Sequence, residues 1–351
     1  MPQLTHGGDW AGFAAEYGTM PLDFSANISP LGLPEGVRRA IAEAAAGQDR
    51  YPDPLCRELC AAIAESRSLP CDWVLCGNGA ADLIWRLALA EKPRHALITA
   101  PTFAEYAAAL ESVGCVVEEV PLSEKTDFSL GEEILELIRP DVDLVLLCEP
   151  NNPTGRTTDP ALLQKVLETC SKTGALLVAD ECFNEFLDDP AAHTLEGQLD
   201  SHANLLILKA FTKWYAMAGV RLGYALCRDT NLLQRVRSAG QPWAVSGLAQ
   251  AAGLAALKET EYSRTLHDLI AAQRPVMAAG LAELGCQVIP GQANYLLFHH
   301  ERPDLVPALR QKGVLLRDCS NYTGLGPGWY RCAVRSEQEN RTFLQAMKEV
   351  L

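Results

Sequence analysis

The segment from residue 209 to residue 224 combines residue types that could hold a phosphorylated carbonyl compound. Lys213 follows Thr212, and Arg221 lies in the glycine-flanked run Gly219-Val220-Arg221-Leu222-Gly223. A lysine amine that is held away from water can attack a carbonyl carbon and form an imine. An arginine fork and a threonine hydroxyl suit phosphate oxygens. A single lysine is more often a surface charge, so the neighbouring motifs must decide between these readings.

A glycine-rich turn, Gly77-Asn78-Gly79-Ala80, lies between a predicted strand and a predicted helix. Such a turn can present backbone N–H groups and a helix N-terminus to an anion. It lacks the third glycine of the dinucleotide fingerprint, because Asp82 stands there, and no Gly-Lys-Ser/Thr of a P-loop follows. A phosphate-binding turn and a purely structural turn are therefore both open.

Two further polar clusters follow apolar strands. Asn151-Asn152-Pro153-Thr154-Gly155 comes after a strand that ends at Cys148, and Asp180-Glu181 closes another. Ligands of α/β sheets bind at the carboxyl ends of the strands, which is where these side chains are expected. An acid at the end of a buried strand is costly unless it meets a cation. The alternatives are an ordinary strand-to-helix turn for the first cluster and a helix cap or solvated loop for the second.

The elements that position these motifs alternate short apolar runs with amphipathic segments. Seven strands are predicted, at Trp73–Cys76, Ala96–Ala100, Val116–Val120, Leu144–Cys148, Leu176–Asp180, Leu205–Lys209 and Leu222–Cys227. Helices are predicted between them, at Ala80–Glu91, Phe103–Val113, Ser129–Ile138 and Pro160–Thr173. Strands without polar alternation indicate a sheet covered on both faces, which is typical of a mostly parallel α/β domain. After Pro242, helices, the strands Val288–Ile289 and Tyr295–Phe298 and a closing helix near Glu337–Leu351 predict an α+β part.

Composition narrows the class of protein. The chain has 351 residues with 30 Lys+Arg against 44 Asp+Glu, a formal charge of -14. This balance opposes a nucleic-acid partner, which needs a basic face. The longest apolar runs are too short to cross a bilayer. The 12 cysteines form no C-x-x-C pair, so we expect free thiols and no metal site. Because residues 1–6 lack a basic start and an apolar run, no secretion signal is expected, and a cytoplasmic location fits.

Taken in order, the five motifs resemble one superfamily. Gly-x-Gly-Ala, Asn-Asn-Pro-Thr-Gly, Asp-Glu-x-Phe, Thr-Lys and Gly-x-Arg-x-Gly follow one another as in fold-type I enzymes that use pyridoxal 5′-phosphate, and the chain is most similar to the histidinol-phosphate aminotransferase-like family. The resemblance covers nearly the whole chain. It implies an α/β large domain with a mostly parallel sheet plus a smaller α+β domain. The expected division is an N-terminal arm and part of the small domain at 1–48, the cofactor domain at 49–242 and the C-terminal small domain at 243–351.

The resemblance also implies roles for individual residues. Lys213 would carry the cofactor as a Schiff base and later donate a proton at Cα, and Asp180 would pair with the protonated ring nitrogen. Asn152 would hold the 3′-oxygen, and Phe103 would stack on the ring. The cofactor phosphate would be held by Thr212, Arg221 and the backbone of Gly79 and Ala80. Tyr51, in a Tyr-Pro-Asp motif, would reach across a homodimer into the partner's site.

Two positions depart from the common pattern. Ala210, three residues before the lysine, lacks the hydroxyl that relatives often carry there, and Phe183 stands where aminotransferases commonly have a tyrosine. Phe183 and several further segments resemble the threonine-phosphate decarboxylases of cobalamin biosynthesis. The segments are His6-Gly7-Gly8, Asp23–Asn27, Pro30-Leu31-Gly32, Phe103–Tyr106, Leu316–Asn321 and Arg331–Arg335.

This second resemblance implies a phosphorylated substrate. Arg317 and Arg331 would grip the substrate phosphate, and His6 and Asn27 would orient the substrate. The alternative for Arg331 and Arg335 is a strand with exposed charges, which is equally expected for Arg335. The expected reaction is decarboxylation of L-threonine O-3-phosphate to (R)-1-amino-2-propanol O-2-phosphate, with L-serine O-phosphate as a close variant. The alternative is an aminotransferase acting on histidinol phosphate or an aromatic amino acid with 2-oxoglutarate. A non-catalytic cofactor-binding protein is disfavoured because Lys213, Asp180 and Asn152 are all present.

Overall fold

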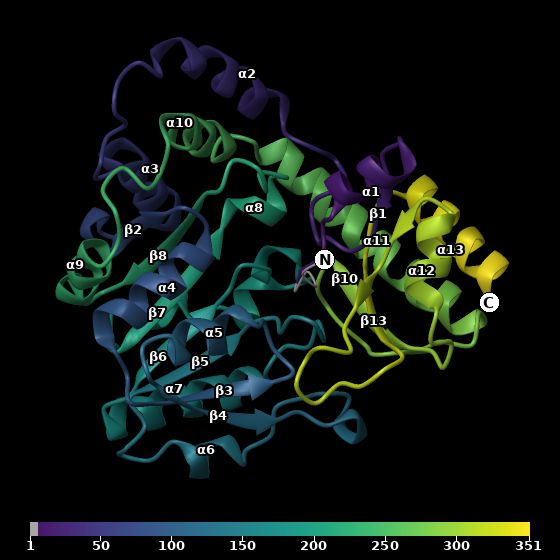
Figure 1. Ribbon diagram of the computed structural model, residues 1–351. Coiled ribbons are helices and arrows are strands. Elements are labelled where there is room, and N and C mark those ends of the chain that lie inside the picture. The colour runs from purple at the N-terminus through teal and green to yellow at the C-terminus, as the bar shows by residue number, and fades with distance from the viewer. Residues whose placement is uncertain (1–5) are drawn as a thin grey trace.

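The fold consists of a large sheet with its helices and a smaller sheet with its own (Figure 1). The computed structural model describes residues 6–351. Residues 1–5 lie outside this range. The prediction that no secretion signal is present was based on residues 1–6, so most of that segment is not described. Within the described residues, none of the helices has the length and apolar character that a membrane span requires.

The large sheet has seven strands in the order β2-β8-β7-β6-β5-β3-β4. They are β2 (Val74–Gly77), β3 (His95–Ala100), β4 (Val116–Pro121), β5 (Leu144–Cys148), β6 (Leu176–Asp180), β7 (Leu205–Ala210) and β8 (Gly223–Cys227). Each lies within one residue of its predicted bounds. All neighbouring pairs are parallel except the two that β8 makes, with β2 and β7. The prediction of a mostly parallel sheet is confirmed.

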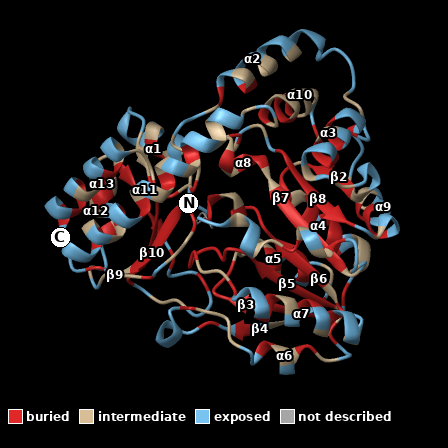
Figure 2. Ribbon diagram, turned by 180° about the vertical axis from the view of Figure 1, so that it is seen from behind, coloured by how far each residue is buried: buried red, intermediate tan, exposed pale blue. Residues whose placement is uncertain are grey.

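Both faces of this sheet are covered, and the burial of its strands is visible in Figure 2. Along β5, Leu144 and Leu146 pack into the core cluster on one side, and Val145 and Leu147 into the cluster on the other. This arrangement explains the continuous apolar runs, because a strand buried on both faces has no polar side.

Helices connect the strands of the large sheet. They are α3 (Arg57–Arg67), α4 (Ala80–Glu91), α5 (Glu105–Glu111), α6 (Ile134–Leu137), α7 (Pro160–Thr173), α8 (Phe211–Trp214) and α9 (Thr230–Ser238). The bounds predicted for α4 and α7 are confirmed. The helix predicted at Ser129–Ile138 is wrong in length, since only α6 forms. Gly131 weakens its first turn, and Pro140 disfavours helical geometry at Arg139.

The smaller part contains a four-stranded sheet in the order β12-β13-β10-β9. Its strands are β9 (Gln287–Val288), β10 (Tyr295–His299), β12 (Arg317–Asp318) and β13 (Trp329–Ala333), accompanied by α11 (Thr260–Glu283), α12 (Leu305–Gln311) and α13 (Glu337–Val350). Strand β12 was not predicted. For β13, a strand with exposed charges was the alternative reading of Arg331 and Arg335; a strand forms, but it ends at Ala333 and Arg331 is buried. β1 (Leu22–Asp23) pairs in parallel with β11 (Val314–Leu315), so the N-terminal arm joins this part of the fold.

Three helices complete the chain: α1 (Trp10–Tyr17), α2 (Glu35–Ala44) and α10 (Gly247–Ala256). α2 packs against α10 (Figure 1). Val37 of α2 and Ala249 of α10 belong to the same core cluster as Leu205 of β7, so this helix pair covers one face of the large sheet. The domain boundaries at residues 48 and 242 stay a prediction.

Candidate active site

A cavity of about 440 Å³ opens beside the carboxyl ends of the parallel strands β5 and β6 and faces the small sheet. It gathers the predicted site residues from both ends of the chain. Those that line it are His6, Asn27, Ala80, Phe103, Asn152, Asp180, Thr212, Lys213, Arg221, Arg317 and Arg331. The geometry therefore brings together all the predicted residues except Gly79, which borders Arg221, and Tyr51.

Lys213 lies on α8, directly after β7, with its side chain reaching the cavity. Burial lowers the pKa of Lys213 to about 8, and the positive charges of Arg331 and Arg221 act in the same direction. A lowered pKa leaves a useful fraction of neutral amine near neutral pH. The neutral amine is the form that attacks a carbonyl carbon.

Asp180 ends β6 and is 5% exposed. Its Oδ2 accepts a hydrogen bond of 2.6 Å from the Tyr106 hydroxyl, and its Oδ1 accepts one of 3.0 Å from the backbone N–H of Cys182. Burial, together with the charge of Asp180, raises the pKa of Tyr106 well above its usual value, so Tyr106 stays a donor. A carboxylate held in this way fits a protonated ring nitrogen.

Sequence reasoning missed the role of Tyr106. Tyr106 belongs to the segment Phe103–Tyr106. It lies in the first turn of α5, three residues after Phe103, which precedes the helix. Residues three apart on a helical turn share a face. This spacing was the signal that could have placed Tyr106 beside the site.

Arg331 is the most confined cation of the cavity, with 6% exposure. Its Nη1 donates to Oδ1 of Asn152, and its Nη2 donates to the Ser25 carbonyl at 2.9 Å. The first bond orients the Asn152 amide so that its Nδ2 remains a donor. Among residues 6–351, no carboxylate forms an ion pair with Arg331, and its Nε has no hydrogen-bond partner.

Arg317 lies beside Arg331, because the two residues are paired across β12 and β13. Its Nη2 donates to Oδ1 of Asn321 at 2.8 Å, and its guanidinium lies 5.3 Å from the centre of the Tyr322 ring. Asn27, from the arm, lines the same cavity, and its buried Oδ1 has no partner within the described chain. The neighbouring arginines suit an anionic group on the substrate.

His6 closes the same side of the cavity. Its Nε2 lies 2.7 Å from Oε1 of Glu105, and its ring centre lies 5.5 Å from that of Phe103. The indole N–H of Trp85 donates to the other oxygen of Glu105 at 3.0 Å. The arm is thus attached to α5 at the entrance of the cavity.

The opposite end of the cavity fits a phosphate group. The start of α4 lies beside Arg221, since a Cβ at Gly79, the residue before the helix, would lie only 2.8 Å from Nη2 of Arg221. Gly79 has a φ of +81°, so glycine meets both the steric and the conformational demand. Arg221 itself has a φ of +62°, and strain of this kind persists where the surroundings over-determine a functional residue.

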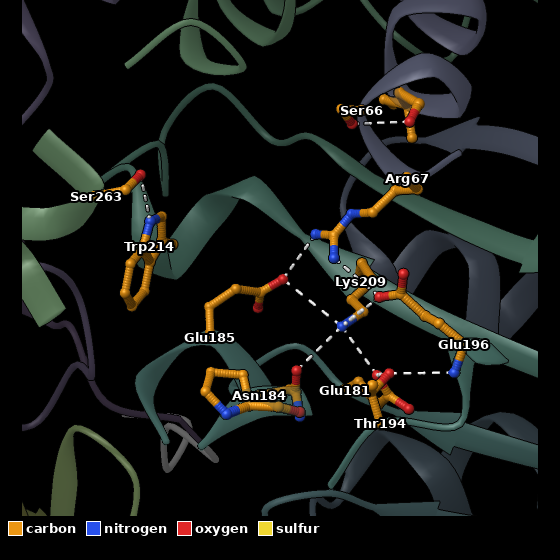
Figure 3. A network of polar contacts seen from close by, with 12 residues as sticks. Ser66, Arg67, Glu181, Asn184, Glu185, Thr194, Glu196, Lys209, Trp214 and Ser263 are labelled. Carbon is orange, nitrogen blue, oxygen red and sulfur yellow. Dashed lines mark hydrogen bonds and ion pairs between the residues drawn. The ribbon is translucent and has the colours of Figure 1, made fainter. Parts of the chain in front are cut away.

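An ionic network forms around Lys209, which is 1% exposed (Figure 3). Lys209 Nζ lies 2.9 Å from Glu181, 3.0 Å from Glu196 and 3.6 Å from Glu185. Arg67 bonds Glu185 and Glu196, each at 2.9 Å. Glu181 thus meets the cation that an acid at a buried strand end requires.

The network lies next to the site along the chain. Glu181 directly follows Asp180, and Lys209, on β7, lies four residues before Lys213. Burial would lower the pKa of Lys209, but the charges of Glu181, Glu185 and Glu196 raise it above its ordinary value. Lys209 therefore serves as a fixed charge. The sequence indicated that an acid at the end of β6 needs a cation, but not which residue supplies it.

Two residues singled out from the sequence lie elsewhere. Tyr51 is 80% exposed and does not line the cavity of its own chain. Arg335 donates to Glu339 at 2.7 Å and to the Asp23 carbonyl at 3.2 Å, also outside the cavity lining. Among the described residues, no group of three or more His, Cys, Asp or Glu side chains is arranged to hold a metal ion.

The chain is similar to known proteins over nearly its whole length. It is 37% identical to the threonine-phosphate decarboxylase of Salmonella typhimurium, over 99% of this chain and 96% of that protein. It is 35% identical to the histidinol-phosphate aminotransferase of Symbiobacterium thermophilum, over 93% and 89%. The crystal structure of the histidinol-phosphate aminotransferase from Clostridium acetobutylicum superposes with a TM-score of 0.87 at 29% identity, covering 93% of this chain and 98% of that one.

The model of the family "Aminotransferase class I and II" matches residues 19–347. The predicted fold class, an enzymatic role and pyridoxal 5′-phosphate as cofactor are thereby confirmed. The chain belongs to the class I and II aminotransferase family.

Proposed function

We propose that this enzyme decarboxylates L-threonine O-3-phosphate to (R)-1-amino-2-propanol O-2-phosphate and CO2, a step towards the cobalamin nucleotide loop. The observation that carries the proposal is Arg331, a buried arginine that lines the same cavity as Lys213 and has no acid partner among residues 6–351. A phosphate ester would supply the missing negative charge. The likeness to the decarboxylase of Salmonella typhimurium, which extends over nearly all of both chains, supports the same reaction.

The cofactor would lie between Lys213 and the start of α4. Lys213 would bind it covalently, Asp180 would pair with its ring nitrogen, and Asn152 would donate to its 3′-oxygen from the Nδ2 that Arg331 leaves available. Phe103 would stack on the ring. The phosphate would be held by Thr212, Arg221 and the backbone N–H groups of Gly79 and Ala80.

The choice of reaction depends on how the substrate is held. When bound, pyridoxal 5′-phosphate accepts the electron pair of the Cα bond that stands perpendicular to its ring. Arg317 and Arg331 would grip the substrate phosphate, with His6 and Asn27 closing over it from the arm. The carboxylate would then be free to take the orientation in which its bond to Cα can break with loss of CO2. Lys213 Nζ would deliver the replacing proton to Cα.

Two related substrates and one related reaction must be distinguished. L-serine O-phosphate lacks a single methyl group, which is worth about 1–3 kcal/mol in an apolar pocket. An aminotransferase acting on histidinol phosphate or an aromatic amino acid would use the same phosphate grip with 2-oxoglutarate as second substrate. Because the chain is 35% identical to the histidinol-phosphate aminotransferase of Symbiobacterium thermophilum, the experiment must also distinguish this alternative.

We also propose a cytoplasmic homodimer with shared active sites. Tyr51 supports this arrangement, because its exposed ring stands clear of the cavity of its own chain. In the dimer it would reach the cofactor phosphate of the partner subunit.

The test is CO2 release from purified enzyme loaded with pyridoxal 5′-phosphate. Threonine phosphate labelled at the carboxylate is supplied with and without 2-oxoglutarate. Label released as CO2 in both samples supports the proposal. Transfer of the amine only when 2-oxoglutarate is present, with the label retained, would overturn it in favour of the aminotransferase.

A further inference from the structure

Tyr51 does not stand alone on the surface. Its ring stacks on that of Trp243, with the ring centres 4.4 Å apart and an angle of 22° between the planes. Tyr51 is 80% exposed and Trp243 is 43% exposed. Within residues 6–351, neither the Tyr51 hydroxyl nor the Trp243 indole N–H makes a hydrogen bond. We call this pair the aromatic ledge; Tyr and Trp of this kind are enriched at protein interfaces.

The ledge is held in place by the backbone around it. Trp243 has a φ of +57°, a conformation that is an outlier for a bulky residue. Gln250 Nε2 donates to the carbonyl of Asp53 and to that of Val245, both at 3.0 Å. One glutamine on α10 therefore fastens the Tyr51 segment to the Trp243 segment, although the two are far apart in the sequence. Strain that is maintained by its surroundings points to a function.

The candidate active site is open where such a ledge could enter. Arg221, the cation at the phosphate end, is exposed in the single chain, and Ala210 supplies no hydroxyl there. An exposed arginine binds an anion weakly, because water screens its charge. A second copy of the chain that placed two ring donors over this end would exclude water and add hydrogen bonds.

We propose that Trp243 enters the active site of the partner subunit together with Tyr51, and that its indole is a positioning residue, which holds the Tyr51 ring so that the Tyr51 hydroxyl can donate to the cofactor phosphate. This inference rests on the homodimer proposed above. It adds a residue to the shared site that the sequence motifs do not include. The aromatic ledge of one subunit would occupy the cavity of its partner. Because Gln250 joins the two segments, Tyr51 and Trp243 would enter that cavity together.

Substitutions at Trp243 test the positioning role through the dissociation constant of pyridoxal 5′-phosphate. We expect W243A to raise this constant about tenfold, the range of one aromatic pair, and W243F to keep it within about threefold. W243G also removes the ring but suits the positive φ, so it should weaken cofactor binding without lowering stability in urea. Trp10, which is 54% exposed on α1, provides the matched control W10A with an unchanged constant.

Hybrid dimers test whether Trp243 acts across the interface. Subunits carrying K213A and W243A are mixed, and cofactor fixed to Lys213 by borohydride is titrated. If Trp243 acts in the partner's site, the hybrid has one intact site and binds with the wild-type constant. Binding with the weak constant of W243A, or no effect of W243A at all, would overturn the inference.

The readout separates this inference from the proposed reaction. A hybrid that binds cofactor normally while threonine phosphate releases no CO2 would remove the decarboxylase proposal and leave the role of Trp243 standing. A monomer in analytical ultracentrifugation of the cofactor-loaded enzyme would remove the inference together with the proposed dimer.

Discussion

Lys209 and Lys213 belong to the same β7–α8 segment, yet their surroundings are opposite. Lys209 is 1% exposed and lies within 3.6 Å of three carboxylates, which raise its pKa above the ordinary value. Lys213 shares its cavity with Arg331 and Arg221, and burial lowers its pKa to about 8. Three carboxylates surround the lysine that stays charged. Around Lys213, burial and two arginines outweigh the carboxylate of Asp180, which lines the same cavity. Substitutions at the two positions and around them test this contrast.

The largest expected effect is the loss of Lys213. Lys213→Ala should reduce turnover by at least about 10³-fold, because the covalent link and the proton donor disappear together. Borohydride reduction of the cofactor-loaded enzyme, followed by peptide mass spectrometry, should place the adduct on Lys213 and none on Lys209. An adduct on Lys209 would reverse the assignment of the two lysines.

Removal of Lys209 should act on stability. Lys209→Met leaves Glu185 and Glu196 paired with Arg67 alone and removes the cation that pairs with Glu181. Breaking a buried ion pair in this way costs about 3–5 kcal/mol. Lys209→Arg keeps the charge and should retain most of the stability. Urea unfolding of the cofactor-free protein measures both variants.

The same experiment separates the two lysines. Lys213→Met removes a cation that burial and two arginines disfavour, so it should leave the cofactor-free protein as stable as wild type or more stable. An equal loss of unfolding free energy in Lys209→Met and Lys213→Met would contradict the difference between the surroundings of the two lysines.

Arg331 should determine the preference for a phosphorylated substrate. Arg331→Met removes charge-assisted hydrogen bonds worth about 1.5–3 kcal/mol each, so kcat/KM for threonine phosphate should fall at least tenfold. Activity on unphosphorylated threonine should change much less. Arg335→Met is the matched control, because Arg335 is already paired with Glu339 at 2.7 Å, and it should leave kcat/KM within about twofold.

The smallest effect concerns Glu149, a buried acid after β5. Burial raises the pKa of Glu149 to about 7, and the charge of Glu181 adds to the rise, although bonds from Thr158 oppose it. A raised pKa means that the folded state binds the proton more tightly, so this contribution to stability is present at low pH and is lost as the pH rises from about 4.5 to 7. The difference in unfolding free energy between wild type and Glu149→Gln should fall across that window, and a flat difference would contradict the shift.

Much of the large sheet could be predicted because its strands are buried on both faces and read as uninterrupted apolar runs. β12 could not, and β13 was considered only as a strand with exposed charges, since Arg317 and Arg331 interrupt the apolar pattern. Both arginines are buried and line the cavity, and local rules tend to fail at functional sites. The two arginines that obscured these strands in the sequence are therefore the residues to which we assign the preference for a phosphorylated substrate.

The candidate site was predictable where a residue sits in an ordered motif, as Asp180 and Lys213 do. The ionic network was not, because Arg67, Glu196 and Lys209 come from segments that only the tertiary fold brings together. Only one residue of the aromatic ledge could be predicted. The Tyr-Pro-Asp motif identifies Tyr51, but its stacking partner Trp243 lies far along the chain and in none of the motifs.

The fate of the substrate carbons in D2O decides between decarboxylation and amine transfer. Threonine phosphate labelled with ¹³C at the carboxylate is incubated with the cofactor-loaded enzyme and 2-oxoglutarate, which supplies the acceptor that amine transfer needs, and the products are followed by NMR. Decarboxylation predicts labelled CO2 and an amino-propanol phosphate that carries one deuterium on the former Cα. A keto acid that retains the label, with no CO2, would contradict it.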